Sequence, residues 1–190
     1  MSFCLAVALL LTLTQDDIER AQKVARASEA ERARFHSRYV FATKDATIIS
    51  MEVVTEFRRV VLVTEDHLRR GDWMFSQSVR AAEEATRDAR GKVSIVAQVR
   101  FHPLNTYIGV PPFRLAAGLP AASAALAPLE TDTSPQYSLA ASPNARGSLI
   151  GATLTSAIMA AAVGQSVRSL GVLLEGKELT RILVDFRGIE

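Results

Sequence analysis

The sequence predicts an α+β protein in which N-terminal helices pack on a mostly antiparallel sheet that a C-terminal β-hairpin completes. Three observations support this prediction. Helix-start signals occur early in the chain, apolar and polar residues alternate over 92–101, and two β-rich arms near the end flank a loop that contains glycine. Alternation with a period of two is typical of a half-buried strand. A short glycine-bearing loop between two such arms is typical of a hairpin.

The first part of the chain, 15–102, is predicted to contain both helices and strands. Asp16 or Asp17 can cap a helix that runs to about residue 27, and residues 28–31 have capping-box spacing for a second helix. Residues 47–54 are β-branched and apolar, which favours a strand. Apolar residues then recur at helical spacing until Gly71, which has the chemistry of a helix stop. One long hairpin through 57–63 is the alternative.

A further helix is predicted over 78–89, followed by the clearest strand, 92–101, with 107–110 as its candidate partner. All seven prolines lie in 103–143. Because proline removes a backbone donor and restricts the residue before it, we expect 116–147 to be a linker or a long surface excursion. It would separate an α+β core at 15–115 from a β segment at 148–190 that joins the same sheet.

The last part of the chain contains an uncharged stretch and a hairpin. Residues 147–167 carry no charge, but their many small and polar side chains make a poor membrane span. We therefore favour a buried strand with a short Ala-rich helical turn. The arms 169–174 and 179–186 predict the hairpin, with Ile182, Val184 and Phe186 facing the core.

The N-terminus predicts export. An apolar stretch from Phe3 to Leu13 is too short to span a bilayer, which takes roughly 20 residues. It is typical of the central region of a signal peptide, although no Lys or Arg precedes it and no small-residue cleavage pattern follows. We expect residues 1–14 to be a signal peptide and the mature chain to begin near Gln15. A buried N-terminal strand or helix is the alternative.

Composition limits the classes of function. The chain has 22 basic and 20 acidic residues, and this balance argues against nucleic-acid binding. Its one cysteine, Cys4, rules out an intramolecular disulfide and a zinc site of four thiolates. No phosphate-binding loop, dinucleotide glycine fingerprint or serine nucleophile elbow is present. We expect no cofactor and no metal.

Candidate catalytic residues are few. The three histidines, His36, His67 and His102, show no metal-ligand spacing. His67 follows Glu65 and Asp66 directly, and a general-base site needs a histidine and carboxylates that converge in a pocket. His67 or His102 with Glu65 or Asp66 is therefore the weak catalytic candidate, and surface or packed histidines are the alternative.

The most distinctive candidate binding surface is the loop that leaves the best strand. It combines an imidazole at His102, an amide at Asn105 and a phenol at Tyr107, and binding residues collect on such loops. A simple turn built by proline and asparagine is the competing interpretation. Trp73 is a second candidate anchor, although we favour Trp73 and Phe75 as core residues.

Together these features predict an exported, non-catalytic binding or protein-interaction domain, periplasmic or secreted. Its partner would be a protein or a small ligand, not nucleic acid, and only the N-terminal export segment would contact a membrane. The first alternative is a small exported hydrolase that uses histidine and carboxylate chemistry. The second is a membrane-tethered accessory protein.

Overall fold

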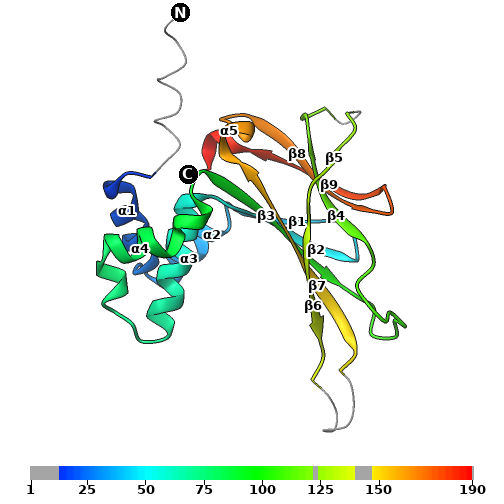
Figure 1. Ribbon diagram of the computed structural model, residues 1–190, viewed down its shortest axis with the longest axis horizontal. Coiled ribbons are helices and arrows are strands. Elements are labelled where there is room, and N and C mark those ends of the chain that lie inside the picture. The colour runs from blue at the N-terminus through cyan, green and yellow to red at the C-terminus, as the bar shows by residue number, and fades with distance from the viewer. Residues whose placement is uncertain (1–12, 122–123, 140–146, 190) are drawn as a thin grey trace, which may run out of the picture.

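The computed structural model describes residues 13–121, 124–139 and 147–189, and it confirms the α+β class (Figure 1). The predicted signal peptide, residues 1–14, falls almost entirely outside these residues. Five α-helices are present in the described part: α1 (Gln15–Ala25), α2 (Glu29–His36), α3 (Glu56–Arg69), α4 (Val79–Thr86) and the short α5 (Ala160–Val163). Three 3-10 turns accompany them: η2 (Phe75–Gln77), η3 (Arg87–Ala89) and η4 (Phe186–Gly188).

The strands form two antiparallel sheets where one was expected. The first sheet has the order β1-β2-β3-β7-β6, from strands β1 (Val40–Ala42), β2 (Ile48–Val54), β3 (Lys92–Arg100), β6 (Asp132–Tyr137) and β7 (Leu149–Met159). The second has the order β5-β4-β8-β9, from β4 (Phe113–Gly118), β5 (Ala127–Pro128), β8 (Val167–Leu174) and β9 (Lys177–Asp185). The C-terminal hairpin is thus β8–β9, and it lies in a different sheet from β7.

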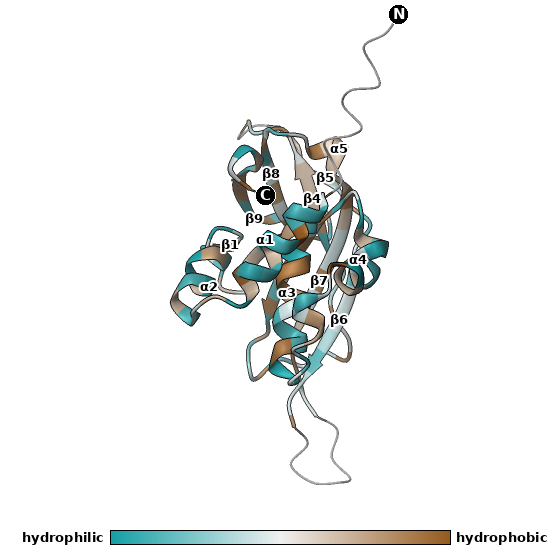
Figure 2. Ribbon diagram, turned by 90° about the vertical axis from the view of Figure 1, so that its left-hand side faces the viewer, coloured by the Kyte–Doolittle hydropathy of each residue, from teal (hydrophilic) through white to brown (hydrophobic). Residues whose placement is uncertain are grey.

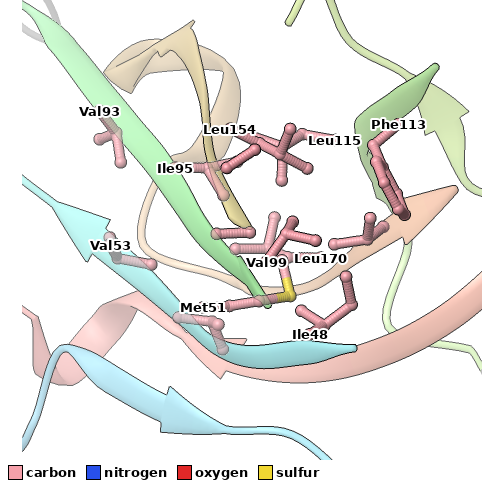
Figure 3. Close-up of a cluster of buried hydrophobic side chains, with 14 of the residues drawn as sticks. Ile48, Met51, Val53, Val93, Ile95, Val99, Phe113, Leu115, Leu154 and Leu170 are labelled. Atoms are coloured by element: carbon pink, nitrogen blue, oxygen red, sulfur yellow. The ribbon is translucent and has the colours of Figure 1, made fainter. Parts of the chain in front are cut away.

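The main core lies between these two sheets. Alternate residues of β2 and β3, such as Met51, Ile95 and Val99, point toward Leu115 of β4 and Leu170 of β8 (Figure 3). These side chains are fully or almost fully buried. The predicted alternation of β3 therefore identified its inner face correctly, and the buried Val184 and Phe186 at the end of the hairpin confirm its inward face.

The helices form a second, smaller core of their own on one side of the sheets. Ile18 and Ala21 of α1 pack with Phe57 and Val61 of α3 and with Ala82 of α4. Figure 2 views this layer face on, with much of its hydrophilic surface turned outward. The helices therefore pack mainly on each other, and polar contacts join them to the first sheet.

Two arginines at the start of α3 make these contacts. Arg58 is buried and donates to the Val53 carbonyl oxygen at 2.7 Å and to a Glu52 carboxylate oxygen at 2.9 Å. Arg59 donates to the hydroxyl of Ser94 on β3. Charged donors to buried backbone are among the stronger hydrogen bonds in proteins, so this pair fixes α3 against the sheet.

The helices begin and end close to the residues that the sequence predicted, and only the cap of α1 differs. The cap of α1 is Thr14, with Asp17 closing a capping box, so the true cap precedes the predicted aspartates. Ser28 and Glu31 form the predicted capping box of α2. The helix expected after the 47–54 strand is α3, and Gly71 follows its end with φ of 83°, a conformation that favours glycine. The alternative hairpin through 57–63 is therefore wrong.

The proline-bearing middle is more ordered than predicted. Strand β6 pairs with β7 over Asp132–Tyr137, and β5 pairs with β4, so described parts of 116–147 add edge strands to both sheets. Pro135 is tolerated because β6 is an edge strand. The candidate partner strand 107–110 is not a strand, and β3 pairs with β2 and β7. Among the described residues, no helix is long and apolar enough to cross a membrane.

Candidate functional site

A groove lies at one end of the molecule, where the β3–β4 loop meets the β6–β7 hairpin. Its volume is about 590 Å³, and it includes the predicted binding loop. We call this feature the tip groove, and its lining residues are Asn105, Thr106, Tyr107, Ile108, Tyr137, Gly147, Ser148 and Leu149. No Asp, Glu, Lys, Arg or His is among these lining residues, so they offer hydroxyl, amide, aromatic and aliphatic surface.

Asn105 builds the loop that forms one wall of the groove. Its side-chain nitrogen donates to the carbonyl oxygens of His102 at 2.7 Å and of Leu149 at 2.9 Å. Its side-chain oxygen accepts from the Tyr107 backbone N–H at 3.0 Å. The turn built by asparagine is therefore confirmed, and because the same turn lines a groove, its role in binding stays a prediction. Asn105 is a positioning residue, since its polar atoms are already engaged.

His102 also supports the loop. Its Nδ1 accepts from the Leu104 backbone N–H at 3.1 Å, and its carbonyl oxygen accepts from the Asn105 side chain. His102 is not a lining residue of the tip groove. His102 therefore shapes the turn, and the binding role predicted for it stays a prediction.

Tyr107 is held from behind by the sheet core. Its ring meets Phe101 edge to face, with centroids 5.1 Å apart, and Phe101 lies over Phe113 at 6.2 Å. Edge-to-face pairs add to the energy gained by burial alone. Tyr107 and Tyr137 nevertheless remain about half exposed. Two phenol rings, of which Tyr107 is fixed by Phe101, therefore reach solvent at the tip groove.

Trp73 lies away from the tip groove. It sits in the turn after α3, at the outer end of the helical layer, whereas the β3–β4 loop is on the opposite side of the molecule (Figure 1). Trp73 and Met74 are both exposed, so the core assignment of Trp73 is wrong. Phe75 is buried as predicted, and His67 stacks on it with ring centroids 3.7 Å apart. The two predicted binding anchors therefore do not form one surface.

The carboxylates near His67 have other partners. Glu65 contacts His36 Nε2 through both oxygens, at 3.0 and 3.1 Å, and Asp66 forms ion pairs with Arg69 and Arg70. Among the described residues, no hydrogen bond or ion pair joins the side chain of Glu65 or Asp66 to His67. Glu65, Asp66 and His67, which the sequence suggested as one catalytic group, therefore each have a different partner.

His67 pairs with Asp72, beyond the end of α3. The distance from Nδ1 to the Asp72 carboxylate is 2.9 Å. This hydrogen bond is the main cause of a lowered pKa of Asp72, and a bond from the Phe75 backbone N–H contributes further. The pair closes the turn between α3 and η2, so it is explained by the local fold.

Sequence reasoning missed the pair of His36 and Glu65, which lie 29 positions apart. Nothing in a single sequence indicates that α2 and α3 approach each other at these positions. Tyr137 was also missed, because β6 is exposed along its whole length and shows no alternation of apolar residues. No group of three or more metal-ligating side chains occurs in the described parts of the chain.

A comparison of the chain with protein-family models and with curated proteins finds no match. The fold class alone does not define an activity, because one fold supports many functions. Function is therefore inferred from the tip groove and from the way its walls are built.

Proposed function

We propose that this chain is an exported, non-catalytic binding protein and that the tip groove is its recognition site. The observation that carries the proposal is an open groove of about 590 Å³ whose loop wall is fixed by hydrogen bonds within the chain itself. Preorganised walls lower the entropy cost of binding. A groove with aromatic and aliphatic surface and a few polar groups is typical of ligand sites.

The chemistry of the lining supports an uncharged ligand. Tyr107 and Tyr137 offer ring faces and hydroxyl groups, and Thr106 and Ser148 offer further hydroxyl groups. A charged ligand would find no side chain of opposite charge among the lining residues. Burying an unpaired charge is costly, so neutral ligands are favoured.

Export is argued from the contacts at the end of the predicted signal peptide. Leu13, the last residue of the apolar stretch, packs against the helical core, and Thr14 caps α1. Leu13 and Ile18 stand at the two positions of a hydrophobic staple around this cap. The folded part thus requires Leu13 and Thr14, and we place the processed N-terminus at or before Leu13 rather than near Gln15.

Two measurements test the proposal. The first is the mass of the gene product recovered from an exporting host, where retention of Met1 would contradict export. The second is an NMR screen of the folded chain against a library of uncharged, fragment-sized compounds. We expect amide shifts to cluster at 104–108 and 137–138. A matched variant, Tyr107→Ser with Tyr137→Ser, should lose these shifts, whereas Trp73→Ser should keep them.

Fragment shifts that are absent, or that cluster around Trp73 or His67, would refute the tip groove as the recognition site. The hydrolase alternative makes a different prediction. It requires His67→Ala and His102→Ala to abolish an activity while the melting temperature stays within a few degrees. Because His67 stacks on Phe75 and His102 holds the loop, we expect both substitutions to lower stability instead.

A further inference from the structure

We propose that the outer edge of β9 is an association surface and that its partner is the same edge of a second copy of this chain. The two strands would run antiparallel around a two-fold axis at Leu183, so that the second sheets of the two copies join into one. This inference is independent of the proposed function, because β9 supplies none of the residues that line the tip groove.

β9 is the longest edge strand of the two sheets in the described part of the chain. The other strands that end a sheet there are β1, β6 and β5. β1 and β5 have three and two residues, and β6 contains Pro135, which has no backbone N–H to donate. β9 has nine residues and no proline. A long edge strand of this kind is a template on which another strand can pair.

The backbone of β9 turns alternate groups toward the open edge. The Phe186 backbone N–H donates to the Ser166 carbonyl oxygen, on the side of β8, at 3.1 Å. In an antiparallel ladder, the N–H and C=O of one residue face the same neighbouring strand, and successive residues alternate. Even-numbered residues such as Val184 therefore bond to β8, and odd-numbered residues such as Leu183 direct their backbone groups away from it. Among the described residues, no strand pairs with β9 on that side.

The centre of this edge is apolar. Leu183 is 58% exposed, on the face of β9 that points away from the core. On the inner face, Ile182 is only partly buried, whereas Leu170, its neighbour on β8, is fully buried. The main core is therefore incompletely covered at β9. A second strand against this edge would cover both side chains, and edge strands that stay unpaired usually carry protective charges there.

The charges around Leu183 identify a second copy as the partner. Arg181 and Asp185 lie two positions to either side of it, on the same face, and have opposite signs. When two β9 strands pair antiparallel with Leu183 opposite Leu183, Arg181 of each copy lies opposite Asp185 of the other. Opposite charges directly across two strands stabilise the pairing, and like charges destabilise it. The strand is therefore complementary to itself in this register.

The neighbouring registers lack this complementarity. Pairing centred on Ile182 sets Arg181 opposite Leu183, and pairing centred on Arg181 sets two guanidinium groups opposite each other. The register centred on Leu183 also sets Ile182 opposite Val184 on the inner face, so the apolar surface of the core continues across the two-fold axis. The charges of the outer face and the apolar side chains of the inner face thus select the same register.

Contacts within the chain hold the two charged side chains in place. Arg181 donates to Glu178 at 2.6 and 3.0 Å and to the Ala121 carbonyl oxygen at 3.1 Å. Asp185 accepts from the Arg187 side chain at 2.8 and 2.6 Å. A guanidinium has several N–H donors and a carboxylate several acceptor positions, so each group can take a further partner. The charges across the two-fold axis therefore add to these contacts and do not require that they break.

Sedimentation velocity of the full chain tests the association. All variants carry Cys4→Ser, which removes a thiol that could link two chains. The paired segment, 181–185, is short, so association should be weak and reversible. We expect the mass to rise from that of one chain toward that of two as the concentration increases from about 1 μM to about 1 mM.

Exchange of the two charges tests the register. Arg181→Glu places a carboxylate opposite Asp185, and Asp185→Arg places a guanidinium opposite Arg181, so each variant alone should stay monomeric. An equimolar mixture of the two should associate again, because every facing pair then has opposite signs. Arg69→Glu and Asp66→Arg, which alter an ion pair on α3, are the matched controls. Each control alone should associate as the unmodified chain does.

A cysteine at the two-fold axis provides the second readout. In a hydrogen-bonded pair of antiparallel strands, facing Cα atoms are about 5.5 Å apart, and a disulfide can span this distance. Leu183→Cys should therefore link two copies under mild oxidation. Met159→Cys, at a position that is 57% exposed against 58% for Leu183, is the matched control and should remain unlinked.

A chain that stays monomeric over this concentration range would overturn the inference, and so would undiminished association of Arg181→Glu alone. A mixture of the two charge variants that fails to associate, while circular dichroism shows both to be folded, would overturn the register. If either charge variant unfolds, the cross-link at position 183 decides, and its absence would refute the two-fold pairing. Fragment binding at the tip groove should be the same in all folded variants, so the proposed function is tested separately.

Discussion

Arg58 is the residue whose replacement should separate the helical layer from the first sheet. Its side chain is 3% exposed and satisfies the Val53 carbonyl oxygen, pairs with Glu52, and lies 5.1 Å from the centre of the Tyr39 ring. Arg58→Met keeps most of the aliphatic length and removes only the guanidinium. The substitution therefore tests the polar contacts and leaves the hydrophobic packing nearly intact.

The expected loss can be built from these contacts. A buried carbonyl left without a donor costs about 2 kcal/mol, and the cation–π contact adds roughly 1 kcal/mol. The pair with Glu52 adds little, because Glu52 is 27% exposed and retains some water. Arg58 Nε has no partner among the described residues, so the native guanidinium is itself not fully compensated. We expect Arg58→Met to lower the free energy of unfolding by about 3 kcal/mol.

Urea denaturation followed by circular dichroism measures this change. Arg69→Met is the matched control, since Arg69 is 73% exposed and pairs only with Asp66; exposed pairs of this kind contribute about 0.5 kcal/mol or less. Arg58→Lys should fall between the two, because it keeps the charge but not the forked donors. A loss below about 1 kcal/mol for Arg58→Met, or equal losses at both sites, would refute the role given to this arginine.

Three further predictions concern single contacts. Thr14→Ala should lower the unfolding free energy by about 1 kcal/mol, because it removes the cap of α1. Under the proposal of export, peptide sequencing of the chain recovered from an exporting host should find no N-terminus later than Leu13. Gly151→Ala should cost about 2 kcal/mol in the same denaturation assay, because its Cβ would overlap the carbonyl oxygen of the paired strand β3. Asp72 has a lowered pKa through its bond with His67, so its stabilising effect is present above the ordinary carboxyl pKa and is lost as pH falls through the lowered value. Asp72→Asn should therefore make the free energy of unfolding fall less steeply as the pH is lowered. An unchanged dependence on pH would contradict the pairing of Asp72 with His67.

Local patterns predicted the individual elements well. The alternation over 92–101 identified β3 and its inner face, and the glycine-bearing loop at 175–178 identified the β8–β9 hairpin. These signals depend on neighbours within a few positions, so a single sequence contains them. The loop at 102–107 was singled out because a polar and aromatic cluster directly after a strong strand is a local feature, and part of this loop lines the tip groove.

Relations between distant segments were not predictable in the same way. The division into two sheets depends on which strands pair. The sequence of 147–167 indicates only that this stretch is apolar enough to be buried, and it does not indicate which strand pairs with it. Strand β6 has no alternation because all six residues are exposed. The exposure of Trp73 follows from the direction of a turn, which composition does not determine. The wall of the tip groove that β6 and β7 supply was missed for the same reason.

The molecule has two separate hydrophobic cores, and this separation affects how the stability and binding experiments are interpreted. The helical cluster is separate from the sheet core, and the tip groove lies on the far side of the sheets from the helices (Figure 1). Substitutions at sites this far apart, with no shared contacts, usually have additive effects. Arg58→Met should therefore lower stability without altering the binding of fragments at the tip groove, and Tyr107→Ser with Tyr137→Ser should weaken fragment binding with little effect on the helical core. The chain can then be weakened at one end and tested for binding at the other, so loss of binding at the tip cannot be attributed to unfolding.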